Sequence, residues 1–342
     1  MTVLVLVAGG AGLLGAAIAK GLLDGADRVV VADHFDDSGD GLAVKEHRAE
    51  RLERHPGASV ERADLTDAAV LEDLFARHRP AAVVNAALFD PFRPDAGALM
   101  KASRAAGTGL FVHLSTGALY APGAETGVPA PEDEEPDPKG DIALTSKLIE
   151  ERRLSELSLP FVNLRIFDVV GPLFPPRRFP VEAFEAILSE EEAFLHDERW
   201  RDFVHVDDVV RAVALAQKRR PVGATLNVGG GLAVNPRTFL SLLARKAGKE
   251  PKVVVLPNAG AGHPRIAKLE AARELLGWSP AYTLDGICES IVKGRLAPFE
   301  EQPTRGTTAP AWGRPEPEEP PKPVSRRELF DLFRRPFRGG ER

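Results

Sequence analysis

Hydrophobic and polar positions follow two different periods along the first half of the chain. Short apolar runs rich in β-branched residues are typical of buried parallel strands. Between them lie longer segments with apolar residues at helical spacing. The apolar runs predict strands at 3–8, 28–33, 58–62, 81–85, 109–115 and 160–166. The longer segments predict helices at 13–24, 42–54, 67–77, 95–106 and 142–158.

This alternation of strands and helices predicts the α/β fold class. Repeated βα units favour a Rossmann-type, doubly wound parallel sheet with right-handed crossovers. From about residue 172 the pattern becomes less regular and carries helical segments at 181–189, 207–217, 236–247 and 267–276. We therefore expect a first domain of this type over 1–171, a smaller second domain over 172–295, and packing of 207–217 back on the first domain.

Proline is concentrated after this globular part. Residues 298–323 contain eight prolines with many charged and few apolar residues, which predicts a disordered Pro-rich linker that we place at 296–324. A helical pattern follows at 325–336, where Ser325 and Glu328 have capping-box spacing and the apolar residues share one face. Such a short amphipathic helix either docks on a protein partner or packs on its own globular domain.

Composition narrows the class of protein. The 342 residues are 44% hydrophobic and 27% charged, which allows a sizeable core and excludes wholesale disorder. The net charge of −6 argues against a nucleic-acid partner. A single cysteine, Cys288, excludes an intrachain disulfide and a Cys-rich metal site, so we expect no metal and a cytoplasmic location. No stretch reaches 18 uninterrupted apolar residues, so we expect no membrane span.

Glycine is repeated between the first strand and the first helix, at Gly9, Gly12 and Gly15. Glycine lets the backbone turn tightly and approach a pyrophosphate, while the helix N-terminus offers N–H groups and partial positive charge. Asp33 ends the next strand, where a carboxylate accepts hydrogen bonds from the hydroxyls of an adenosine ribose and repels a 2′-phosphate. Asp36 and Asp37 follow it, and the next arginine along the chain is Arg48. The pattern predicts NAD binding, with NADP less favoured; the alternative is a tight turn that binds nothing.

Further motifs follow in a set order. They are Asp64-Leu65 after the third strand, Ala86-Ala87 after the fourth, a Ser-Thr-Gly-Ala-Leu-Tyr run ending at Tyr120, Ser146-Lys147, and Arg-Asp-Phe-Val-His-Val-Asp-Asp from Arg201. In this order and spacing, over residues 2–295, they resemble the extended short-chain dehydrogenase/reductase family, which contains the NAD-dependent nucleotide-sugar epimerases and dehydratases.

The resemblance implies that the domain over 1–171 binds NAD, that the domain over 172–295 mainly binds the substrate, and that each motif has a role. The implied cofactor-binding residues are Gly9, Gly12, Leu13, Leu14, Gly15, Asp33, Asp64, Leu65, Ala86, Ala87 and Lys147. Thr116 takes the place of the family's catalytic Ser/Thr, and Lys147 that of its catalytic lysine. Arg201 takes the place of an arginine that pairs with the pyrophosphate of a nucleotide sugar. Arg265 lies either at a second phosphate-binding position or in a surface loop.

The chain departs from the family at the proton donor. The family has a tyrosine four residues before its lysine, and Ala143 stands there in this chain. The only tyrosines are Tyr120 and Tyr282, so no neighbouring tyrosine replaces it. Three explanations remain open. Another acid serves, with Tyr120, Asp141 and His113 as candidates; the substrate supplies its own proton; or the protein is non-catalytic.

The resemblance therefore implies an NAD-dependent sugar-nucleotide epimerase, dehydratase or oxidoreductase with altered acid–base chemistry. The alternative is a non-catalytic NAD-binding scaffold or regulatory protein of the same fold. The expected partner is a nucleotide sugar or a similar small molecule. The segment from Ala87 to Thr116 is short for the family and truncates a helix that often forms its dimer face, so a homodimer is an open expectation.

Overall fold

The computed structural model describes residues 2–37, 41–87, 96–122, 127–138, 140–172, 174, 179–195, 198–256 and 264–296. They belong to one compact unit, Met1–Arg305. Apart from Leu296, the linker and the helix predicted over 296–324 and 325–336 lie outside the described residues. Among the residues described, no helix combines the length and apolarity needed to cross a membrane.

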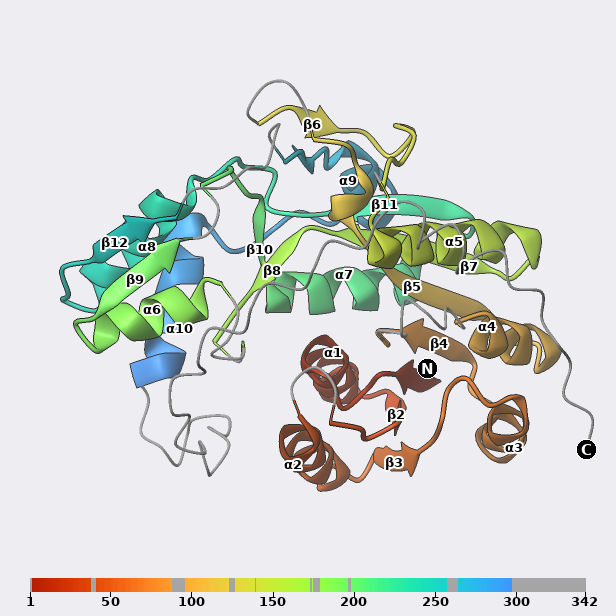
Figure 1. The fold of residues 1–342 in the computed structure, drawn as a ribbon. Coiled ribbons are helices and arrows are strands. Elements are labelled where there is room, and N and C mark those ends of the chain that lie inside the picture. Colours follow the sequence, from red (N-terminus) through yellow and green to blue (C-terminus); the bar gives the residue numbers. More distant parts are fainter. Residues whose placement is uncertain are drawn as a thin grey trace, which may run out of the picture. The chain divides into compact units, whose positions relative to one another are not determined.

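A seven-stranded parallel sheet forms the centre of the fold, in the order β11-β7-β5-β4-β1-β2-β3 (Figure 1). Its strands are β1 (Leu4–Ala8), β2 (Arg28–Asp33), β3 (Ala58–Arg62), β4 (Ala82–Asn85), β5 (Leu110–Thr116), β7 (Phe161–Ile166) and β11 (Ala224–Val228). The first six agree with the predicted strands to within about a residue at each end. The Rossmann-type α/β fold class is therefore confirmed.

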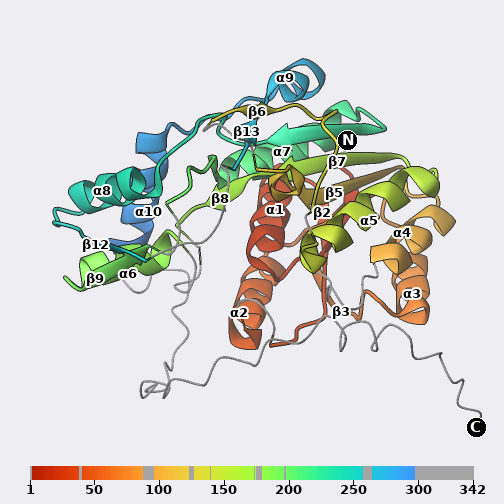
Figure 2. The same cartoon turned by 45° about the horizontal axis from the view of Figure 1, so that its top comes forward.

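Helices cover both faces of this sheet (Figures 1 and 2). On one face lie α1 (Leu13–Asp24), α2 (Leu42–Glu53), α7 (Val206–Arg219) and α9 (Glu270–Leu276); on the other lie α3 (Ala68–His78), α4 (Ala96–Ala105) and α5 (Ile142–Glu156). Successive strand residues enter opposite cores: Val5 and Val7 pack on the first face, and Leu6 and Ala8 on the second. Because both faces are buried, the strand is apolar throughout.

The sheet draws on residues beyond 171, where the sequence pattern placed a domain boundary. Strand β11 is hydrogen-bonded to β7, and α7 packs against α1. The two helices approach closely at Gly21, where an added Cβ would lie 2.2 Å from Val210 Cγ1. Trp278 is fully buried in the same core.

A second hydrophobic core lies beside the sheet and is called here the small lobe. It consists of α6 (Val181–Leu188), β9 (Glu192–Leu195), α8 (Pro236–Lys246), β12 (Lys252–Val255) and α10 (Leu284–Leu296). Phe239 at its centre is fully buried and stacks on Phe203 with ring centroids 4.4 Å apart. Helix α10 was not predicted, because Gly286 and Gly294 weaken its helical signal.

Short elements lie outside the seven-stranded sheet, and β8 and β10 contribute Val170 and Phe203 to the core of the small lobe. Strand β8 (Asp168–Val170) pairs in parallel with β10 (Phe203–His205), and β6 (Pro129–Ala130) pairs with β13 (Ile266–Ala267). A 3₁₀ turn, η1 (Gly117–Leu119), follows β5. Of these segments, β8 follows β7, and η1 and then β6 follow β5, so they begin at the carboxyl ends of sheet strands, the edge at which α/β sheets bind ligands.

Candidate active site

The glycine-rich loop packs directly on the segment that follows β4. Gly9 has a φ of +72°, and a Cβ added to it would lie 2.6 Å from the backbone of Ala87. A Cβ at Gly15 would lie 2.0 Å from the carbonyl oxygen of Gly9. Gly12 is the N-cap of helix α1 and provides no side-chain cap. Only glycine fits this loop, and the uncapped helix start suits an anionic ligand such as a pyrophosphate.

Asp33 is held beside this loop at the end of β2. Its Oδ2 accepts a hydrogen bond from the backbone N–H of Ala11 at 3.1 Å, and its Oδ1 accepts one from Phe35 at 3.1 Å. Lys45 of α2 places its Nζ 3.8 Å from the same Oδ1 and also pairs with Asp36. The charge of the carboxylate that we expect to meet the ribose is thus partly offset by a buried cation.

Sequence reasoning missed Lys45, although a signal was present. Lys45, Ala49 and Leu52 have helical spacing and form the buried face of α2. A lysine on that face is directed toward the end of β2. Counting arginines near Asp33 in the sequence could not find it.

The other predicted cofactor residues follow the same edge of the sheet. Asp64 and Leu65 follow β3, and the Asp64 carboxylate accepts hydrogen bonds from the hydroxyl and backbone N–H of Thr66, which lower its pKa. Ala86 and Ala87 follow β4. Since β3, β2, β1 and β4 are consecutive neighbours in the sheet, the structure brings these positions to one edge.

Thr116 ends β5 at that edge. Its Oγ1 accepts a hydrogen bond from the backbone N–H of Ala118 at 3.1 Å and so caps η1. This bond fixes the side chain and uses a lone pair of its oxygen. The hydroxyl hydrogen is left to donate to the oxygen of a ligand.

Lys147 extends from α5 beneath the end of β5. Its Nζ lies 2.8 Å from Glu150 Oε2 and 3.5 Å from the carbonyl oxygen of Leu114. The Glu150 side chain is only 3% exposed, and His113 Nε2 lies 3.4 Å from the same oxygen. Burial raises the pKa of Glu150, and Lys147 opposes that shift. Burial, assisted by the charge of Lys147, holds the pKa of His113 well below its usual value, so this histidine is neutral.

The start of α5 carries Ala143 and Asp141 where the family has its tyrosine. Ala143 is exposed in the first turn. The carboxylate of Asp141 is the N-cap and accepts a hydrogen bond from the backbone N–H of Leu144 at 3.0 Å. Asp141 therefore has a structural role that explains its position.

Tyr120 is 3% exposed and belongs to a buried polar network. Its hydroxyl donates to Asn227 Oδ1 at 2.8 Å and accepts from Arg165 at 2.9 Å. Arg165 also forms a bidentate pair with Glu151. Burial raises the pKa of the Tyr120 phenol. With its hydroxyl committed on both sides, Tyr120 is poorly suited to the acid–base role that the sequence suggested.

The two predicted phosphate-binding arginines differ in their surroundings. Arg201 pairs with Asp168 at 3.1 Å, and its guanidinium lies over the Phe179 ring. Arg265 makes two 2.7 Å bonds to the carboxylate of Glu134 and donates to the carbonyl oxygens of Val128 and Pro129. Arg265 thus fastens β13 to the segment around β6, and a phosphate would have to displace Glu134.

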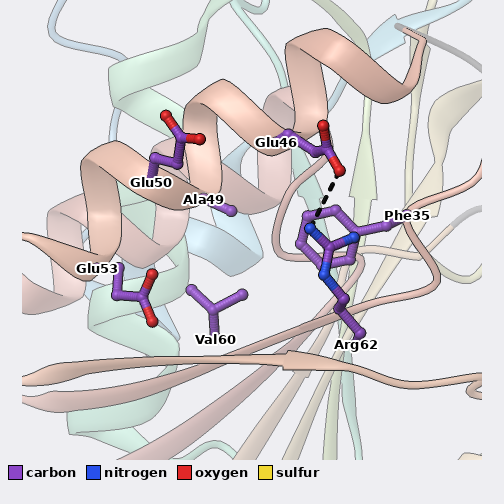
Figure 3. Close-up of a pocket in the computed structure, with 7 residues that line it drawn as sticks. All are labelled: Phe35, Glu46, Ala49, Glu50, Glu53, Val60 and Arg62. Atoms are coloured by element: carbon purple, nitrogen blue, oxygen red, sulfur yellow. Dashed lines mark hydrogen bonds and ion pairs between the residues drawn. The ribbon is translucent and has the colours of Figure 1, made fainter.

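A cavity of about 350 Å³ opens between α2 and the β2–β3 edge of the sheet (Figure 3). Its walls are Phe35, Glu46, Ala49, Glu50, Glu53, Val60 and Arg62. The Arg62 guanidinium lies over the Phe35 ring and pairs with Glu46. None of the predicted catalytic residues line this cavity. Within the described ranges, no group of three His, Cys, Asp or Glu side chains is arranged to hold a metal ion.

Known proteins resemble the chain along its globular part. The family model described as NAD dependent epimerase/dehydratase matches residues 5–94 and 96–229. A UDP-glucose 4-epimerase of Rhizobium leguminosarum bv. trifolii is 30% identical over 328 residues, covering 84% of this chain and 95% of the relative.

Solved structures agree with this match. The structure of a Thermotoga maritima UDP-glucose 4-epimerase with UDP-glucose has a TM-score of 0.73 and 27% identity, over 85% of this chain and 97% of the other. A Thermus thermophilus UDP-glucose 4-epimerase in complex with NAD has a TM-score of 0.73 and 28% identity, over 86% of this chain and 99% of the other.

Proposed function

Because the chain belongs to the NAD-dependent epimerase/dehydratase family, we propose that it is an enzyme that uses NAD to oxidise and reduce a nucleotide sugar reversibly. The relatives named above are UDP-glucose 4-epimerases, so inversion at a sugar carbon through a carbonyl intermediate is the reaction that we favour. The non-catalytic scaffold is the less favoured alternative.

One observation carries this proposal. Except for Lys147 of α5, the residues predicted for cofactor binding lie at or shortly after the carboxyl ends of four neighbouring strands, β4-β1-β2-β3, and Thr116 ends the next strand, β5. In this order β1 and β4 are adjacent although two strands separate them in the sequence, which marks the point where the winding of the sheet reverses. A fold alone would not require Thr116, Lys147 and Asp33 to gather around that point.

The residues present fit NAD. The Gly9–Gly15 cradle leaves no room for side chains where the loop meets Ala87, and the uncapped N-terminus of α1 faces that loop and offers N–H groups to the pyrophosphate. The Asp33 carboxylate accepts hydrogen bonds from the ribose hydroxyls, and Asp64 and Leu65 border the adenine. The nicotinamide supplies the hydride acceptor when NAD is bound.

Side chains of the protein bind the sugar nucleotide and stabilise the charge that develops during the reaction. The Thr116 hydroxyl donates a hydrogen bond to the sugar oxygen and stabilises the charge that develops there as the carbonyl forms. Lys147 places an amine beside the same centre. We assign the diphosphate to Arg201, which forms an ion pair with Asp168. By contrast, Arg265 makes two bonds to Glu134 and two to backbone carbonyl oxygens.

A panel assay tests the proposal. The full-length protein, loaded with NAD⁺, is incubated with UDP- and dTDP-sugars, and the absorbance of bound NADH and the sugar products are measured. We expect epimerised product from at least one UDP-sugar. Lys147→Ala should abolish it, while Lys20→Ala, which changes an exposed lysine of α1, should have no effect. NAD⁺ binding without hydride transfer from any sugar would favour the non-catalytic alternative.

Three finer expectations stay predictions from the sequence. They are a homodimer, a protein partner for the helix predicted at 325–336, and a cytoplasmic location. Sedimentation of the full chain and of a chain ending at residue 296 would address the first two together. Loss of the tail should leave NAD⁺ affinity unchanged.

A further inference from the structure

Two adjacent glutamates on α5 have partners of different chemistry. Glu151 accepts hydrogen bonds from Arg165 and from the hydroxyl of Ser115. Glu150 lies 2.8 Å from Lys147 Nζ and 3.4 Å from His113 Nε2. Arginine does not release its proton in proteins, whereas lysine and histidine do so when buried. The Glu151 pair is therefore a fixed ion pair, and only Glu150 lies beside groups that can exchange a proton.

Asn85 fixes which ring nitrogen of His113, the histidine beside Glu150, carries the hydrogen. Asn85 Oδ1 accepts from the backbone N–H of Ala87 at 3.2 Å, so the Asn85 amide nitrogen faces His113. That nitrogen donates to His113 Nδ1 at 3.2 Å. Neutral His113 consequently carries its hydrogen on Nε2, which faces Glu150 Oε2. Nε2 forms no hydrogen bond with any residue that the structure describes, and it lies 3.4 Å from Glu150 Oε2. Because it carries the hydrogen, His113 does not take a proton from Glu150.

Burial makes the Glu150–Lys147 contact sensitive to protonation. The side chains of Glu150 and Lys147 are 3% and 15% exposed, and a charge in such surroundings needs a close partner. Transfer of one proton from Lys147 to Glu150 replaces two buried charges with two neutral groups. Glu150 is thus the carboxylate to which a Lys147 ammonium can pass its proton directly.

Resting on the proposed function, we propose that Lys147 and Glu150 together replace the family's tyrosine, with Lys147 as the acid–base group and Glu150 as the residue that takes and returns its proton. In oxidation, the sugar C–H bond breaks and its hydrogen leaves with the electron pair as hydride to NAD⁺. The hydroxyl proton passes to the neutral amine of Lys147, and a C=O bond forms. In reduction, hydride returns to the carbonyl carbon and the Lys147 ammonium returns the proton to oxygen. The pair ends with the one proton it had at the start.

The charges around Glu150 are consistent with this assignment. Burial raises its pKa, Lys147 and Arg153 act to lower it, and Glu151 acts to raise it. These groups and His113 of β5 are the titratable and charged neighbours that face it. The raised pKa brings the proton affinity of Glu150 nearer to that of an amine.

Glu150→Gln is the decisive substitution, because the amide keeps the shape of the side chain and cannot take a proton. Given a general acid–base contribution of roughly 10²–10⁴-fold, we expect kcat to fall by roughly 10²-fold, with NAD⁺ affinity and the KM for the sugar within about twofold of wild type. The limb on the acid side of the kcat–pH profile should move to higher pH, because Lys147 alone must then lose its proton. Glu156→Gln, at an exposed position on the same helix, is the matched control.

A second measurement does not depend on activity. The carboxyl of Glu150 can be titrated by ¹³C NMR in the full-length protein, with and without NAD⁺, and assigned by its loss in Glu150→Gln. We expect it to titrate above the usual range of glutamate, and Lys147→Met to move the titration to still higher pH. The Glu156→Gln variant should leave the resonance unchanged.

The two proposals fail in different ways. If wild type transfers hydride and Glu150→Gln keeps its kcat and pH profile, the acid–base pair is wrong and the proposed function stands. If no sugar reacts, the proposed function fails. In that case a Glu150 carboxyl that titrates in the usual range and does not respond to Lys147→Met also overturns the pairing.

Discussion

The space around Gly15 excludes side chains from the glycine-rich loop. The Cα hydrogen of Gly15 points at the carbonyl oxygen of Gly9, and a methyl group there would overlap the backbone. A backbone neighbour cannot rotate away as the end of a side chain can. The loop must therefore open if any side chain is placed at this residue.

We predict that Gly15→Ala lowers NAD⁺ affinity by roughly ten-fold or more, equivalent to about 1.4 kcal/mol, and destabilises the fold by about 1–3 kcal/mol through overpacking. Calorimetric titration with NAD⁺ and urea unfolding measure the two effects. Gly25→Ala is the matched control, since Gly25 has a φ of −80° and its added Cβ would meet nothing closer than 3.4 Å. Equal affinities for wild type and Gly15→Ala would contradict the pyrophosphate assignment.

The buried carboxyl group of Asp202 should make the stability of the fold depend on pH. Its buried carboxylate accepts hydrogen bonds from the backbone N–H groups of Gly230, Gly231 and Ala267, and burial raises its pKa to about 7 from an ordinary value of 3.8. The folded state then binds this proton more tightly than the unfolded state does. The contribution to stability is complete below about pH 4 and is lost as the pH rises through about 7.

Urea unfolding of wild type and Asp202→Asn between pH 4 and 8 checks this. The asparagine cannot titrate. As the pH rises from 4 to 7, the free energy of unfolding of wild type should therefore fall relative to that of Asp202→Asn, by up to about 1.4 kcal/mol for each pH unit. A difference that stays constant over this range would mean that the three N–H donors keep Asp202 ionised.

The sequence predicted those site residues whose positions depend only on the strand or loop to which they belong. Gly9, Gly15 and Asp33 could be placed because a strand, a turn and a helix start fix their positions locally. The contact between His113 and Glu150 could not be foreseen, since it depends on how α5 packs over β5. Tyr120 was proposed from its place in a motif, and only its contacts with Arg165 and Asn227 show that its hydroxyl is already engaged.

At the scale of helices and strands, most elements follow from hydrophobic period alone. Strands with uninterrupted apolar runs and helices with clear apolar faces were predicted within about one or two residues at each end. Strand β11 was missed because Thr225 and Asn227 interrupt its apolar run. Asn227 is nevertheless fully buried there, since its side chain bonds to Tyr120 and to the carbonyl oxygen of Ala130.

The contact between α1 and α7 provides the test at this scale. Gly21→Ala should destabilise the fold by roughly 1–3 kcal/mol through overpacking against Val210, although alanine is the better helix former by about 1 kcal/mol. Val210→Ala removes the obstructing methyl groups. The double variant should therefore be more stable than the sum of the two single changes predicts, as measured by a double-mutant cycle in urea. Strict additivity would show that the helices do not meet at Gly21.

At the scale of the whole described part, two kinds of core coexist. The two sheet cores hold the cofactor edge, and the small lobe has its own core around Phe239. Damage to the second core need not reach the first, because the glycine loop and Asp33 take no residue from the small lobe.

Phe239→Leu should accordingly lower stability by roughly 1–3 kcal/mol and raise the KM for the nucleotide sugar, while NAD⁺ affinity stays within about twofold. Thermal unfolding, steady-state kinetics and calorimetric titration report these three quantities. Phe194→Leu, at an exposed position of β9, should change none of them. A parallel loss of NAD⁺ affinity in Phe239→Leu would show that the two parts are energetically inseparable.

The strand order has a consequence for synthesis on the ribosome. The ribosome produces β1, β2 and β3 first. Strand β4 then pairs with β1, on the side away from β2, and β5, β7 and β11 each pair with the strand added before them. No strand has to be inserted between two that have already paired. Because domains begin to fold from the N-terminus while translation continues, the cofactor cradle can assemble on a growing chain. The outer edge of β3 stays as it is, and growth takes place only at the other edge of the sheet.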